Sequence, residues 1–126
     1  MEDDANTRVI TAGSRKVIAG TPNAPLLRTA DDVVELIGLC MEHSARAVLL
    51  HDENMPEHFF DLSSGEAGAI LQKLRNYHIR LALVAPDGSV LMTGKFREMA
   101  LEEGRGSDFR LFEDEASAVF WLAGGS

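Results

Sequence analysis

The sequence predicts an α/β fold, built as one domain around a mixed, largely parallel sheet with an N-terminal β-hairpin and about four helices. Short β-branched or apolar runs alternate with segments in which apolar residues recur at helical spacing. Residues 45–50 and 79–84 are almost continuously apolar, which is typical of strands buried on both faces under covering helices. The chain has 126 residues, a length that suits one domain with its own core.

The first two strands are predicted at residues 8–12 and 16–19. They are joined by Gly13-Ser14, and glycine at the first central position of a two-residue loop favours a type II′ hairpin turn. We expect residues 1–6 to be disordered and residues 124–126 to be frayed, which leaves 7–123 as the folded domain.

Three of the predicted helices have a clear start signal. Thr29 precedes the first helix, with Asp32 three residues later as a variant of the capping box. Ser63 and Glu66 form the S-x-x-E capping box of the second helix, and Asp114 caps the fourth. Apolar side chains on one face of the second and fourth helices are then expected in the core: Ala67, Ile70, Leu71, Leu74, Tyr77, Ala118, Trp121 and Leu122.

The remaining strands are predicted at residues 46–51, 79–84 and 108–112, and the third helix at 96–103. Residues 89–93 fit either a short strand or a loop. The resulting order is β-β-α-β-α-β-α-β-α. Strands that alternate with helices imply right-handed crossovers and a sheet that is parallel apart from the hairpin.

The chain is acidic, with a net charge of −8 and an isoelectric point near 4.9. Its 12 lysines and arginines, taken as dispersed, offer little basis for contacts to nucleic-acid phosphates or anionic lipids. We therefore expect neither a nucleic acid nor a membrane as a partner.

The cellular context is predicted from the cysteine content and the N-terminus. Cys40 is the single cysteine, so an intramolecular disulfide is impossible and a reducing compartment is favoured. The acidic N-terminus lacks the apolar core of a secretory signal, and no run approaches the ~18 apolar residues of a membrane span. We expect a cytoplasmic protein with Cys40 in its core.

Five motifs are spread along the chain: ITAGSRKVI at 10–18, LLHDEN at 49–54, FFDL at 59–62, GAILQK at 68–73 and RGSDFRLF at 105–112. With them, residues 9–122 resemble a small bacterial family catalogued as domain of unknown function 4180. The resemblance covers nearly the whole chain and implies no activity.

The run DLSSGEAGAIL at 61–71 is similar to the STAS domain of anti-sigma-factor antagonists. In that family an Asp-Ser-Ser-Gly stretch opens the helix after a central strand, and a partner kinase phosphorylates one of its serines. The resemblance implies a STAS-like fold and makes Ser63, Ser64 and Asp61 candidates for a phosphoacceptor or a partner surface. The residues by themselves favour a simpler role for the two serines, as helix caps.

A second group of candidates follows the predicted central strand, where open α/β sheets commonly bind ligands. His51, Asp52 and Glu53 lie there, and Arg105 lies between two glycines where an anion could bind. The alternative is that the loop residues bond the loop backbone and Arg105 joins surface ion pairs. The histidine spacing matches no familiar metal motif, so neither a metal nor another cofactor is expected.

The sequence contains no recognisable set of nucleophile, base and orienting residue and no phosphate-binding glycine loop. We therefore predict a non-enzymatic bacterial regulatory or protein-interaction domain with an unidentified protein partner, and homodimer formation stays open. The alternative is a small-ligand-binding module at the carboxyl ends of the strands, near His51 and Ala85-Pro86. A third hypothesis is a small enzyme that uses His51 and nearby carboxylates.

Overall fold

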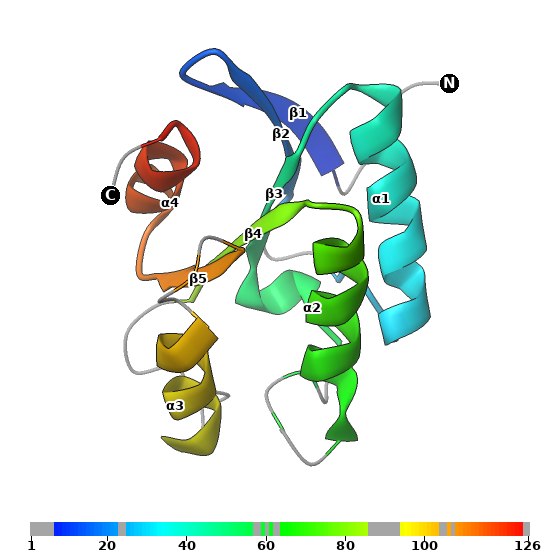
Figure 1. Ribbon diagram of the computed structural model, residues 1–126, viewed down its shortest axis with the longest axis vertical. Coiled ribbons are helices and arrows are strands. Elements are labelled where there is room, and N and C mark those ends of the chain that lie inside the picture. The colour runs from blue at the N-terminus through cyan, green and yellow to red at the C-terminus, as the bar shows by residue number, and fades with distance from the viewer. Residues whose placement is uncertain are drawn as a thin grey trace.

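The computed structural model describes residues 7–22, 25–56, 59, 61, 64–85, 94–103, 106 and 108–124, with side chains described for 98–102 of the 94–103 segment. In this part of the chain five strands form one sheet in the order β1-β2-β3-β4-β5 (Figure 1). The observed elements alternate as predicted, and the α/β fold with a mixed sheet is confirmed.

The N-terminal hairpin pairs β1 (Thr7–Ala12) antiparallel with β2 (Arg15–Gly20). Gly13 and Ser14 alone connect the strands, because Ala12 is the register partner of Arg15. Gly13 adopts a φ of +65°, whereas Ser14 is not among the residues with positive φ. This combination is that of the predicted type II′ turn.

The other strands run parallel to β2. They are β3 (Ala47–His51), β4 (Arg80–Val84) and β5 (Phe109–Phe112). Each begins within one residue of its predicted start. The amino ends of β2, β3 and β4 therefore lie along one edge of the sheet.

Three helices cover one face of the sheet: α1 (Val33–Glu42), α2 (Glu66–Asn76) and α3 (Gly94–Glu103). Each lies in a crossover between neighbouring parallel strands, and the strand order always advances in the same direction. Right-handed crossovers then place all three helices on the same side. The fourth helix, α4 (Glu115–Leu122), follows the last strand and packs on the opposite face (Figure 1).

Two buried layers result, one on each face of the sheet, because successive strand residues point to opposite faces. The strand residues on the side of α1 and α2 are Ile18, Val48, Leu50, Leu81, Leu83 and Phe109. Those on the side of α4 are Ala12, Val17, Ala19, Ala47, Leu49, Ala82 and Val84. The central strands are buried on both faces, as predicted. The alanines among them allow α4 to approach the sheet closely.

Asp114 caps α4 as predicted, but α2 begins at Glu66 with Gly65 as its N-cap, so the predicted capping box with Glu66 as the third helical residue is wrong. A short 3-10 turn, Ala30–Asp32, leads into α1, and the Asp32 carboxylate accepts from the backbone nitrogen of Arg28 at 2.8 Å. At α4 the Asp114 carboxylate accepts from Ser117 N at 2.7 Å, and this bond holds the pKa of Asp114 below its usual range. Ser63, the predicted cap of α2, lies outside the described residues.

One core prediction is wrong. Tyr77 was assigned to the apolar stripe of α2, but it is 51% exposed. The helix ends at Asn76, so the chain turns away before Tyr77 can reach the core. Cys40 does lie in the core, and burial raises the pKa of its thiol to about 11. No helix in the described ranges is both long enough and apolar enough to cross a membrane.

Candidate functional site

Of the residues predicted at the carboxyl edge of the sheet, the structure describes His51, Asp52 and Glu53. β3 ends at His51, whose side chain is 11% exposed, and its Nε2 lies 3.4 Å from Oε1 of Glu115 on α4. Glu115 Oε2 in turn lies 3.3 Å from Nη2 of Arg8 on β1. Sequence reasoning missed Glu115, because only the packing of α4 on the sheet brings it to His51.

Asp52 and Glu53 belong to a short 3-10 turn, Asp52–Asn54, in which the buried residue is Asn54. The Asn54 side chain accepts from His51 N at 2.7 Å and donates to Thr21 O at 2.8 Å. This turn therefore ties the end of β3 to the chain after β2. Asp52 is half-buried and Glu53 is exposed.

Within the described residues, no three His, Cys, Asp or Glu side chains come together as a metal site would require. Arg105, the fourth ligand-binding candidate, and the loop after Ala85 lie outside the described part of the chain. The hypothesis of a ligand site at this edge stays a prediction.

The start of α2 contains the STAS-like candidates. Ser64 Oγ donates to Asp61 O at 2.8 Å and accepts from Glu66 N at 3.2 Å, and both Ser64 and Asp61 are exposed. Gly65 follows with a φ of +79° and allows the turn into the helix. The Ser64 hydroxyl therefore accepts from the first backbone N–H of α2, although Gly65 is the N-cap residue of this helix.

The amino-terminal edge of the sheet has a feature that the sequence did not reveal. Helices α1 and α2 end in matching turns, in which Ala45 N donates to Cys40 O and Ile79 N donates to Leu74 O. The residues just before them, Ser44 and His78, have φ values of +56° and +58°. Glycine is the usual residue at such a left-handed position, because a Cβ there is unfavourable.

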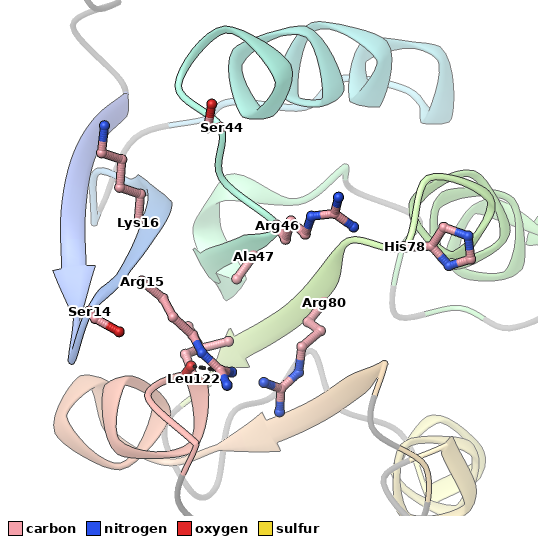
Figure 2. Close-up of a pocket in the computed structure, with 9 residues that line it drawn as sticks. All are labelled: Ser14, Arg15, Lys16, Ser44, Arg46, Ala47, His78, Arg80 and Leu122. Carbon is pink, nitrogen blue, oxygen red and sulfur yellow. Dashed lines mark hydrogen bonds between the residues drawn. The ribbon is translucent and has the colours of Figure 1, made fainter.

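These two turns border a cavity of about 520 Å³. Figure 2 shows that its walls come from the hairpin, from the two helix-to-strand turns and from the end of α4. The complete lining consists of Ser14, Arg15, Lys16, Ser44, Arg46, Ala47, His78, Arg80 and Leu122. Four of these residues are lysine or arginine, one is histidine, and none of those nine is acidic.

Strand pairing explains why the arginines meet. Arg80 is the register partner of Ala47, and Arg80 N donates to Arg46 O at 3.0 Å. The guanidinium groups of Arg15 and Arg80 point into the same space beside Leu122, and Arg46 extends towards His78 (Figure 2). Lys16 points away from the guanidinium groups of Arg15 and Arg80, and we assign it to the rim.

Contacts with α4 orient two of these cations. Arg15 Nη1 donates to Leu122 O at 3.4 Å, and the Arg80 guanidinium lies 4.2 Å from the centre of the Trp121 ring. Burial, and then the charge of Arg15, hold the pKa of Arg80 below its usual range, while Asp108 acts in the opposite direction. Asp108 also pairs with Arg75, at 3.5 Å. The positive charges of Arg15 and Arg80 are therefore held close enough to repel each other.

The cavity corrects the earlier assumption that the cations are dispersed. The sequence does contain a weak signal, because Ser44-x-Arg46 and His78-x-Arg80 occur at the same offset from the ends of two helices. Recognising it required the strand register, which brings the two residues to the same end of neighbouring strands. His78, which precedes Arg80 by two residues, also lines the cavity.

Comparison with known proteins shows the family. The sequence pattern described as "Domain of unknown function (DUF4180)" matches residues 12–122, which is most of the chain. The chain belongs to the DUF4180 family. The match confirms the resemblance seen in the sequence motifs, and it includes all nine residues that line the cavity of this DUF4180 domain. Neither the curated proteins nor the solved structures contain a match.

Proposed function

We propose that this DUF4180 domain binds a small anionic ligand in the basic cavity at the amino-terminal edge of its sheet. The observation that carries the proposal is that Arg15, Arg46, Arg80 and His78 all line one cavity in a chain of net charge −8. A volume of about 520 Å³ lies within the range of small-molecule sites. Guanidinium groups suit phosphate and carboxylate groups because they donate two parallel hydrogen bonds.

The ends of the helices weaken the positive potential without cancelling it. Helices α1, α2 and α4 all end at this edge, and each helix end carries roughly −0.5 of an elementary charge. The lining has four full positive charges before His78 is counted. The net charge at the cavity therefore stays positive, and the negative helix ends attract the cations and help to hold them close together.

Two features prepare the cavity for an anion. The Trp121 ring, whose centre lies 4.2 Å from the Arg80 guanidinium, limits the motion of that group. Ser44 and His78 retain polar side chains at backbone positions that favour glycine. Strain of this kind is concentrated at binding sites in proteins.

The test is a calorimetric titration of the full chain with pyrophosphate, at low and at high salt. We expect saturable binding that weakens as salt is added. Replacing Arg80 by Met should weaken binding about 10-fold or more, because a hydrogen bond to a charged group contributes roughly 1.5–3 kcal/mol.

Arg110→Met is the matched control. Arg110 also lies over the Trp121 ring, at 5.7 Å, but it is not part of the cavity lining. Arg110→Met should therefore bind pyrophosphate like the unchanged protein. Absence of binding, or an equal loss in both variants, would contradict the proposal.

The regulatory protein-interaction hypothesis is retained as a second candidate function, because Ser64 and Asp61 are exposed together at the start of α2. Its test is a pull-down that compares unchanged protein with Ser64→Asp and Ser64→Ala. Loss of a specific partner in Ser64→Asp alone would support a phosphorylation-sensitive surface, because aspartate adds charge beside Asp61 and Glu66. If the unchanged protein and both variants capture the same partners, the hypothesis of a phosphorylation-sensitive surface is rejected.

A further inference from the structure

The basic cavity adjoins a second hollow. This neighbouring hollow has a volume of about 490 Å³ and shares Ser44, Arg46 and His78 with the first. Its remaining lining consists of Cys40, Met41, Ala45, Asn76, Tyr77 and Ile79. The two hollows lie next to each other at the amino-terminal edge of the sheet, the first beside the end of α4 and the second beside the ends of α1 and α2, and we call them together the groove.

The two ends of this groove differ in chemistry. The first hollow contains Arg15, Lys16 and Arg80, whereas the second contributes no charged residue beyond Arg46 and His78, which both hollows share. In their place the second hollow presents Tyr77 and Met41, which are 51% and 62% exposed. They are two of the five large hydrophobic side chains that stand exposed in the described part of the chain.

The position of Tyr77 has a structural cause. Tyr77 caps α2, and the left-handed residue His78 follows it directly, so the turn that points His78 at the cavity also keeps Tyr77 out of the core. An exposed aromatic face beside a cluster of guanidinium groups is the combination that binds a flat ring attached to a phosphate.

We propose that the anionic ligand is a mononucleotide, with its phosphate among Arg15, Arg46 and Arg80 and its base on Tyr77. This inference rests on the proposed function and adds the class of ligand. The second hollow is nearly as large as the first, so it accommodates a base with its sugar. Asn76 also lines the second hollow; its Oδ1 accepts from Gln72 Nε2 at 2.9 Å, and its amide N–H groups are the donors we assign to the edge of the base.

The experiment compares AMP, ribose 5-phosphate and adenosine by calorimetry with the full chain. Ribose 5-phosphate has the same sugar and phosphate as AMP but no base, and adenosine has no phosphate. We expect AMP to bind about 10-fold more tightly than ribose 5-phosphate, because stacking of one base on an aromatic side chain typically contributes a factor of this order. Adenosine should bind more weakly than AMP.

Variants of Tyr77 separate this inference from the proposed function. Tyr77→Ala should remove the preference for AMP over ribose 5-phosphate and leave pyrophosphate binding unchanged, while Tyr77→Phe should retain the preference. Phe120→Ala is the control for loss of an exposed aromatic ring, since Phe120 is 63% exposed on α4 and lines neither hollow.

Three results would overturn the assignment of a mononucleotide: equal affinities of AMP and ribose 5-phosphate for the unchanged protein, a preference for AMP that survives in Tyr77→Ala, or equal affinities of AMP and adenosine. In each of these cases pyrophosphate would still report on the basic cavity. If pyrophosphate itself fails to bind, the proposed function fails and the mononucleotide inference fails with it.

Discussion

Ser44 and His78 occupy the same position in two successive helix-to-strand turns, with φ values of +56° and +58°, and both side chains line one cavity. Neither residue is glycine, although the backbone conformation favours glycine at both positions. The repeated geometry explains how Arg46 and Arg80, each two residues further on, reach neighbouring strands at the same edge of the sheet.

The left-handed conformation at His78 predicts that one substitution, His78→Gly, raises the stability of the fold and weakens the binding of pyrophosphate. Replacing His78 by Gly should stabilise the fold by about 0.5–1 kcal/mol, because relief of the left-handed strain exceeds the entropy that glycine adds to the unfolded chain. The same variant should bind pyrophosphate more weakly, because it lacks the imidazole. Urea unfolding and calorimetry measure the two effects. A loss of stability in His78→Gly would show that the side chain supports the fold instead.

A second prediction concerns the contact between Gly20 and Asn54. A Cβ added at Gly20 would lie 2.4 Å from Asn54 Oδ1, which is buried and already bonded to His51 N. Gly20→Ala should therefore destabilise the protein by about 1–3 kcal/mol, the usual effect of overpacking. Gly38→Ala is the control in urea unfolding. Gly38 is an exposed residue of α1, and no atom lies within 4 Å of the Cβ that would be added there. The control should gain roughly 0.5–1 kcal/mol from helix propensity.

A third prediction concerns Cys40 and alkaline pH. Burial raises the pKa of this thiol from its ordinary value of 9.0 to about 11, so the folded state favours the protonated form. The stability due to the neutral thiol is fully present below pH 9.0 and is lost as pH rises towards about 11. Cys40→Val should lack this part of the decline in urea unfolding measured across that window.

The same burial should slow modification of Cys40 in the native protein. A thiol-specific reagent added near neutral pH should react with native chain far more slowly than with chain unfolded in urea, because the thiolate is scarce and the sulfur is covered. Equal rates in the two states would contradict the buried position.

A fourth prediction is that the protein does not bind duplex DNA at physiological salt. The cations at the cavity are few, and the chain carries a net charge of −8, so extended contacts along a phosphate backbone are disfavoured. A gel shift at about 150 mM salt tests this expectation. A clear shift that disappears in Arg80→Met would instead show that the basic cavity contacts nucleic acid.

Local signals in the sequence were sufficient for the elements of the fold. The Gly13-Ser14 turn, the Asp114 cap and the apolar runs of β3 and β4 depend on residues close together in the chain, and each was predicted within one residue. The covering of both sheet faces followed from the same runs, because a strand without polar alternation must be buried on both sides.

Tertiary structure decided which distant side chains meet. Glu115 reaches His51 only because α4 runs back across the second face of the sheet. Arg15 and Arg80 line one cavity only because the hairpin turn, the start of β4 and the end of α4 lie together at the amino-terminal edge of the sheet. Tyr77 has the spacing of a core residue, but the end of α2 leaves it exposed. Periodicity and capping describe a few neighbouring residues, whereas the cavity depends on strand register and on the handedness of the crossovers, which appear only when the whole chain is packed.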